Sequence, residues 1–253
     1  MDVRVALVRH GETDWNANAR YQGQRDTPLN DNGLRQARAL GGHMACRRVL
    51  AVFSSDLERA RITAEHVAAP HGLSVSLRAG LREMAFGDWE NLTAREIASR
   101  WPGLYSQWLD DPVSTRPPNG ENLTELLDRS VAALHGIIAE STAAGSIAAP
   151  RRRIAGPAPL APNRHEAGDD IPTIVVVSHG GPIRALLCEI LGLPPKEGFW
   201  SVEASPGGYA VVRSRGGSVQ EIVRSNPRGA NACAGAGARL EGLVVERVNV
   251  IPA

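Results

Sequence analysis

Two short apolar runs that lie far apart in the chain each end in a histidine followed by a glycine. Val5–Val8 precedes Arg9-His10-Gly11, and Thr173–Ser178 precedes His179-Gly180-Gly181. Short runs of β-branched and aliphatic residues are typical of buried strands. Ligands of open α/β sheets bind in the crevice beyond the carboxyl ends of the parallel strands. The two runs therefore predict parallel strands that bring two imidazoles to one edge of one sheet.

The bulk properties indicate an ordinary globular protein. A length of 253 residues suits one α/β domain with an ample core, and a net charge of +1 gives no support for nucleic acid or an acidic membrane surface as a partner. The three cysteines show no zinc-binding spacing, and no apolar run approaches the roughly 20 residues that span a bilayer. No signal peptide is visible, since strand-like residues begin at Val3. We expect a cytoplasmic protein that acts on a small molecule.

The periodicity along the chain favours an α/β fold, with three α/β/α layers around a mostly parallel central sheet and a small helical cap. Residues 34–44 and 57–67 keep helical spacing. Asn30 or Asp31 is the expected N-cap of the first of these helices, and Asp56 that of the second. Further strands are predicted at 50–53 and 73–77, and a hairpin is predicted from 209–213 and 219–223.

These patterns divide the chain into segments. Residues 1–227 are expected to form the α/β domain, with the helical cap at about 84–140. Residues 141–172 are rich in Ala, Gly, Pro and Arg and lack periodicity, which predicts a mobile insertion. Residues 228–253 form a Gly/Ala-rich C-terminal extension, in which the alternation of 243–251 favours an added edge strand.

Charged residues near the predicted strand ends point to an anion site. Arg59 lies in the first turn of a helix that follows a strand, on the same edge of the sheet as His10. An arginine and a helix N-terminus together bind anions well. Two glutamates compete for an acid/base role. Glu83 follows an apolar position near a strand end, whereas Glu90 precedes a helix start and is interpreted as a surface charge.

Several motifs in the chain resemble those of the histidine phosphatase superfamily, which includes phosphoglycerate mutases and many phosphomonoesterases. The resemblance rests on Arg9-His10-Gly11-Glu12-Thr13 with Asn16, and on Ser178-His179-Gly180 far downstream. Ser54–Ala64 is similar to the second motif of the family, and Leu81–Glu90 is similar to its proton-donor segment. The resemblance covers about residues 3–193.

The resemblance implies a role for each of these residues. His10 would attack phosphorus and form a phosphohistidine, while Arg9, Arg59 and His179 hold the phosphoryl oxygens. Glu83 would protonate the leaving alkoxide and then deprotonate the attacking water. The remaining contacts to the phosphoryl group would come from the Asn16 side chain and from backbone N–H groups around Gln22, Gly23 and Gly180. The resemblance implies neither a metal ion nor another cofactor.

Three functions remain open at this point. The first is a metal-independent phosphomonoesterase that hydrolyses a small phosphorylated metabolite. The second is a phosphoglycerate mutase, but family mutases carry an arginine directly after the acid/base glutamate, where this chain has Met84-Ala85. The third is a non-catalytic phosphate-binding protein, which the complete set of site residues disfavours. An exposed edge strand would permit a homodimer.

Overall fold

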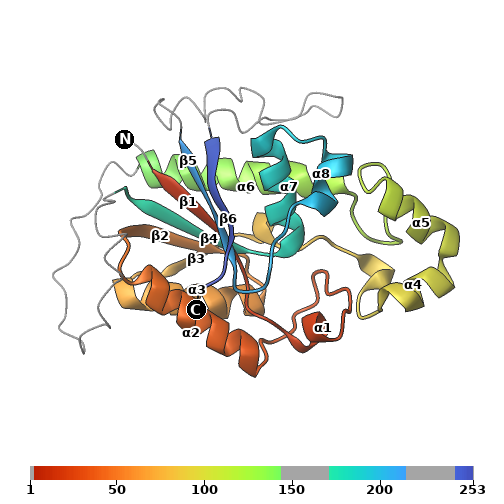
Figure 1. Ribbon diagram of the computed structural model, residues 1–253, viewed down its shortest axis with the longest axis horizontal. Coiled ribbons are helices and arrows are strands. Elements are labelled where there is room, and N and C mark those ends of the chain that lie inside the picture. The colour runs from red at the N-terminus through yellow and green to blue at the C-terminus, as the bar shows by residue number, and fades with distance from the viewer. Residues whose placement is uncertain (1–2, 144–170, 215–242, 253) are drawn as a thin grey trace.

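The computed structural model describes residues 3–143, 171–214 and 243–252. Strands in these residues form one mixed sheet in the order β3-β2-β4-β1-β5-β6 (Figure 1). Neighbours among β1, β2, β3 and β4 run parallel, β5 is antiparallel to β1, and β6 is antiparallel to β5. The strands are β1 (Arg4–Arg9), β2 (Val49–Ser54), β3 (Val75–Leu77), β4 (Thr173–Ser178), β5 (Tyr209–Ser214) and β6 (Leu243–Val250). The predicted mostly parallel sheet is confirmed.

Helices cover both faces of the sheet, with α2 and α3 on one face and α6 and α7 on the other (Figure 1). The sequence of β1 sets this arrangement, because Val5 and Leu7 pack on the α6–α7 side while Ala6 and Val8 pack on the α2–α3 side. The helices are α1 (Asp14–Ala17), α2 (Asp31–Met44), α3 (Glu58–Ala68), α4 (Ala94–Arg100), α5 (Pro102–Asp110), α6 (Leu123–Ala143), α7 (Gly180–Leu191) and α8 (Pro195–Ser201). The three-layer α/β/α fold is therefore confirmed.

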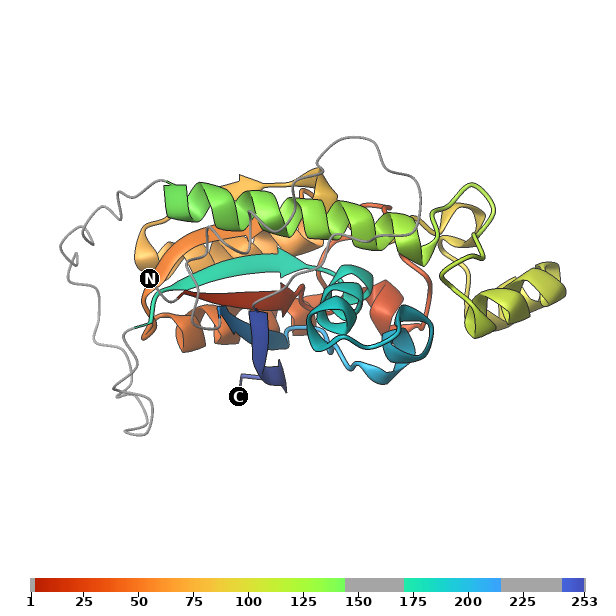
Figure 2. The same ribbon diagram turned by 90° about the horizontal axis from the view of Figure 1, so that it is seen from above.

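A small cap made by α4, α5 and the preceding segment stands beyond the carboxyl edge of the sheet (Figure 2). The cap has an apolar core of its own, which includes Met84, Trp89, Ile97 and Trp108. Trp89 and Trp108 are fully buried there. The indole rings meet edge to face with their centroids 5.5 Å apart, a favourable arrangement for aromatic pairs.

The structure corrects two boundaries. The predicted cap range of 84–140 includes much of α6, but Val131, Leu134 and Ile138 of that helix pack in the main core under the sheet. The apolar core of the cap therefore ends in the first turn of α6, at Leu123 and Leu126, since an amphipathic pattern shows which positions are apolar but not what covers them.

The predicted N-cap Asp56 is also wrong. The structure places Leu57 at the N-cap of α3, and that residue provides no side-chain hydrogen bond to the helix. Asp56 instead accepts two hydrogen bonds from the Arg82 guanidinium, and the Glu58 N–H donates to Asp26 Oδ1 at 2.7 Å. The predicted cap at the first helix is confirmed, because Asn30 Oδ1 accepts from the Gly33 N–H at 2.8 Å.

Three predictions fall wholly or partly on residues outside those described. They are the strand at 219–223, most of the insertion at 141–172, and the first part of the extension at 228–253. The edge strand predicted at 243–251 is confirmed by β6, which pairs with β5. A homodimer through an edge strand stays a prediction.

The correction at α6 has a testable consequence for stability. Replacement of the fully buried Leu134 by Ala leaves a cavity under the sheet and should lower the free energy of unfolding by about 2–5 kcal/mol. Leu109→Ala is the matched control, because this leucine of α5 is 42% exposed and its loss should cost about 0.5 kcal/mol or less. Urea denaturation measures both. Equal costs for the two variants would contradict the assignment of α6 to the main core.

Candidate active site

His10 and His179 lie side by side at the carboxyl edge of the sheet. Arg9 and Ser178, the last residues of β1 and β4, are partners in the parallel ladder, and the His10 N–H donates to the Ser178 carbonyl at 3.1 Å. The ring centroids are 5.0 Å apart, and both side chains are buried. The predicted meeting of two imidazoles at one edge is confirmed.

The hydrogen bonding of His10 fixes its tautomer. Nδ1 lies 2.6 Å from the Gly11 carbonyl oxygen, and because a carbonyl only accepts, Nδ1 must carry the proton. The lone pair is therefore on Nε2. Burial lowers the pKa of His10 well below its ordinary value of 6.5, and the positive charges of Arg59 and Arg9 lower it further. His10 is thus a neutral imidazole at neutral pH, with Nε2 available as a nucleophile.

Ser55 positions the second imidazole, which the sequence analysis did not anticipate. The Ser55 hydroxyl lies 2.9 Å from His179 Nε2, and its oxygen also accepts from the Leu57 N–H. Nδ1 of His179 is buried and has no partner among the described residues. Burial, followed by the charge of Arg59, lowers the pKa of His179 well below 6.5. The sequence signal for this contact was a serine directly after β2, because β2 neighbours β4, the strand that His179 follows.

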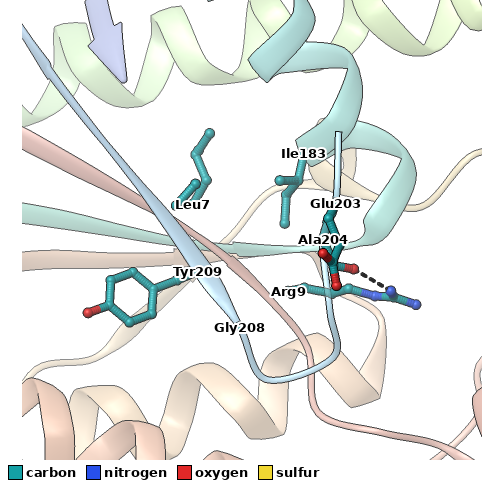
Figure 3. A pocket seen from close by; sticks show the side chains of 8 residues that line it. Leu7, Arg9, Ile183, Glu203, Ala204, Gly208 and Tyr209 are labelled. Carbon is teal, nitrogen blue, oxygen red and sulfur yellow. Dashed lines mark hydrogen bonds between the residues drawn. The ribbon is translucent and has the colours of Figure 1, made fainter. Parts of the chain in front are cut away.

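Arg9 and Arg59 bring positive charge to the site, and among the described residues neither forms an ion pair with a carboxylate, although Glu83 lies within electrostatic reach of both. Arg59 is fully buried and donates to the carbonyls of Arg25 and Gly23, both at 2.8 Å. Arg9 donates to the Ala204 carbonyl at 2.6 Å (Figure 3). Burial lowers the pKa of each guanidinium to about 10, so both stay cationic at neutral pH. Two half-buried or buried cations whose described partners are carbonyls make a strong site for an anion.

The Gln22–Gly23 loop closes one side of the site. Gly23 has φ +58°, and a Cβ there would lie 2.0 Å from Glu90 Oε1. Gln22 is buried, and its Oε1 accepts from the Thr27 hydroxyl at 2.8 Å. Glu90 accepts from the Gln24 N–H at 3.0 Å, and its side chain is only 12% exposed. The interpretation of Glu90 as a surface charge is therefore wrong, because this carboxylate holds the loop in place.

Asn16 and Gly180 lie near the ends of β1 and β4, as the sequence predicted. Asn16 Oδ1 accepts from the Thr13 N–H at 3.1 Å in a capping box at the start of α1. The amide nitrogen of Asn16 has no protein acceptor among the described residues and remains a potential donor. Gly180 is the first residue of α7, and a Cβ there would lie 3.4 Å from Arg9 Cζ.

Glu83 lies against the N-terminus of α7, the helix that begins directly after His179. Its Oε1 accepts from the N–H groups of Gly181 at 3.0 Å and Met84 at 2.8 Å. A Cβ on Gly181 would lie 2.3 Å from Oε1, so any side chain at this position would displace the Glu83 carboxylate. Arg129 of α6 supports the segment by donating to the carbonyls of Glu83 and Arg82 at 2.8 and 2.7 Å. No sequence signal marked Arg129, which occupies an ordinary polar position of an amphipathic helix.

Neither a metal site nor a membrane span is found in the described part of the chain. It contains no cluster of three or more His, Cys, Asp or Glu side chains that could hold a metal ion. None of the helices described there is both long and apolar enough to cross a bilayer.

Known proteins share these features. The family profile described as the histidine phosphatase superfamily (branch 1) matches residues 5–149 and 145–227. A glucosyl-3-phosphoglycerate phosphatase of Mycolicibacterium vanbaalenii is 36% identical over 84% of this chain and 84% of its own. A probable phosphoglycerate mutase of Klebsiella pneumoniae is 36% identical over 76% of each chain. The solved structure of a mycobacterial glucosyl-3-phosphoglycerate phosphatase superposes with a TM-score of 0.71 at 27% identity, covering 98% of this chain and 99% of that one.

The buried histidines should make stability depend on pH. His10 and His179 stay neutral in the folded protein, whereas in the unfolded chain they take up protons below about pH 6.5. Folding stability is therefore complete above that pH and should fall by about 1.4 kcal/mol per pH unit for each histidine as the pH drops below it. Urea denaturation between about pH 7.5 and about pH 5.5 measures this slope. His10→Asn and His179→Asn should each make it shallower, and an unchanged slope in both variants would contradict the assignment.

Proposed function

The chain belongs to the histidine phosphatase superfamily as a phosphoric monoester hydrolase, and we propose that it works through a phosphohistidine on His10. The observation that carries the proposal is the buried, neutral His10, whose Nδ1–H is held by the Gly11 carbonyl. Its Nε2 lone pair is therefore available among the cations that an incoming phosphoryl group needs. Attack of Nε2 on phosphorus forms the N–P bond and breaks the bond to the ester oxygen.

Arg9, Arg59 and His179 hold the phosphoryl oxygens in this proposal. The described partners of the two guanidiniums are carbonyl groups, so a dianionic phosphoryl group would be their first anionic partner. His179 offers a buried ring nitrogen that has no partner among the described residues. Asn16 and the backbone around Gln22, Gly23 and Gly180 complete the binding site. These groups neutralise the charge that develops in the transition state, a role that metal ions play in other phosphatases.

Glu83 is the proposed acid and base. In its protonated form it gives a proton to the leaving alkoxide, and it then takes a proton from the water that cleaves the N–P bond. The products are the alcohol and inorganic phosphate, and His10 returns to its starting form. The position of Glu83 supports this role, because the Gly181 N–H holds its carboxylate at the start of α7 and it lies within electrostatic reach of Arg9 and Arg59.

The proposed substrate is a small phosphorylated metabolite. The most similar relatives include phosphatases named for glucosyl-3-phosphoglycerate and for phosphoserine, and the second of these is 28% identical. Mutase activity is the second candidate, because a probable phosphoglycerate mutase is 36% identical. Met84-Ala85, in place of the arginine of family mutases, favours hydrolysis.

Phosphate release from a panel of phosphomonoesters, measured with EDTA present, tests the proposal. The wild-type protein should release phosphate in the presence of EDTA. His10→Ala should lower the rate of phosphate release by at least about 1,000-fold, because the nucleophile is gone. Loss of wild-type turnover in EDTA would contradict the metal-independent mechanism. Isomerisation of 3-phosphoglycerate without phosphate release would establish the mutase instead.

Glu83→Gln separates the two chemical steps. With an alkyl phosphate, kcat should fall by about 100- to 10,000-fold, because the leaving alkoxide lacks its proton donor. With p-nitrophenyl phosphate the leaving group needs no proton, so the variant should form phosphohistidine and then hydrolyse it slowly. Mass spectrometry of the intact protein at neutral pH should show one added phosphoryl group.

The matched control for this experiment is Glu197→Gln, which changes an exposed glutamate of α8. It should match wild type in turnover and should not accumulate the intermediate. A Glu83→Gln variant with wild-type turnover of alkyl phosphates would remove Glu83 from the mechanism.

A further inference from the structure

Arg184 is a cation near the site that the proposed chemistry does not use. It lies on α7 four residues after Gly180, so the two positions share one face of the helix. That face is turned toward Arg9, because a Cβ on Gly180 would lie 3.4 Å from Arg9 Cζ. Long side chains on a helix lean toward its N-terminus. The Arg184 side chain is therefore directed along α7 toward the end that carries His179.

Arg184 and Arg9 contact the same short segment of chain. Arg184 Nε donates to the Val202 carbonyl at 3.0 Å, and Arg9 Nη1 donates to the Ala204 carbonyl at 2.6 Å. Figure 3 shows the Arg9 guanidinium lying against this segment beside Glu203 and Ala204. The two positive charges are thus held near each other by neutral carbonyl groups.

The terminal nitrogens of Arg184 have no hydrogen-bond partner among the residues that the structure describes. Among the described residues, no carboxylate forms an ion pair with Arg184, and Nε makes its one side-chain hydrogen bond. The side chain is half-buried. A partly desolvated guanidinium with two unused NH₂ groups has the geometry to bind a planar carboxylate through two parallel hydrogen bonds.

Arg184 interacts electrostatically both with Arg9 and with Tyr21, which packs against the cap. Burial is the main cause that lowers the pKa of Arg9, and the positive charge of Arg184 adds to it. Burial raises the pKa of Tyr21, and Arg184 acts in the opposite direction. Tyr21 packs edge to face against Phe86 and Trp108 of the cap. Arg184 therefore lies within electrostatic reach of both Arg9 and the Tyr21 side chain at the cap.

We propose that Arg184 binds a carboxylate of the leaving group, so that the preferred substrates are phosphomonoesters of hydroxy acids. This inference rests on the proposed phosphatase function. The phosphoryl group is matched to Arg9, Arg59 and His179, and Arg184 is a further cation that a neutral leaving group would leave unpaired. Arg184 lies on α7, so its place in the chain differs from that of the arginine that family mutases carry directly after the acid/base glutamate.

Two esters that differ in one group test the inference. 3-Phosphoglycerate carries a carboxylate where glycerol 3-phosphate carries a hydroxymethyl group. Phosphate release from both is measured for wild type, Arg184→Gln and Arg184→Lys. Wild type should show a higher kcat/KM for 3-phosphoglycerate than for glycerol 3-phosphate. Arg184→Gln should lower kcat/KM by about 10- to 100-fold for 3-phosphoglycerate alone, since one charge-assisted interaction disappears. Arg184→Lys keeps the charge but cannot form two parallel hydrogen bonds. Its kcat/KM for 3-phosphoglycerate should therefore lie between those of wild type and Arg184→Gln.

The matched control is Arg48→Gln, an exposed arginine just before β2, at the opposite edge of the sheet. It should keep the wild-type ratio of the two kcat/KM values. An equal loss on both esters in Arg184→Gln would show that Arg184 only positions residues 202–204, and no loss on either would show that it does not contact substrate. Either result overturns the inference.

p-Nitrophenyl phosphate distinguishes failure of the inference from failure of the phosphatase function. If wild type releases phosphate from it in a His10-dependent way but does not prefer 3-phosphoglycerate to glycerol 3-phosphate, the inference fails and the phosphatase function stands. If wild type hydrolyses none of these esters nor any member of the wider panel, both fail.

Discussion

Positive charge buried at the carboxyl edge of the sheet is the constraint on which the site depends. Arg9 and Arg59 are desolvated, and carbonyl groups rather than carboxylates are their described partners. Such an arrangement lowers stability, because hydrogen bonds to carbonyl groups offset only part of the hydration free energy that a buried guanidinium loses. Burial, and then the same charges, lower the pKa of His10 and keep it neutral. The cations that would bind the phosphoryl group therefore also help to keep the nucleophile in its reactive form.

The sequence revealed the parts of this arrangement that depend on strand ends. The two His-Gly pairs follow strands that are adjacent in the sheet, and Arg59 follows a third, so residue type and position were enough to predict a shared edge. The layers of the fold were equally predictable, because β1 and the helices that cover it show clear periodicities.

The sequence could not reveal contacts that depend on loop paths. Ser55 meets His179, Arg129 supports Glu83, and Glu90 restrains the loop at Gly23, and each of these pairs is distant along the chain. Asp56 shows that a local sequence signal can also mislead. Its side chain suits a helix N-cap, but pairing with Arg82 through two hydrogen bonds was available in the fold. The preference of a residue type for the N-cap position does not decide its role when the folded protein offers its side chain a stronger partner.

The separate core of the cap has a consequence for how such an enzyme diversifies. Trp89 and Trp108 pack in an apolar cluster separate from the two that cover the sheet, although this cluster also takes in Leu126 of α6 and Ala185 of α7. Substitutions on the outer surfaces of α4 and α5 can therefore reshape the region beyond the strand ends while β1 and β4 stay in place. Substitutions at the base of the cap act differently, because Met84 belongs to the same cluster and its N–H holds Glu83.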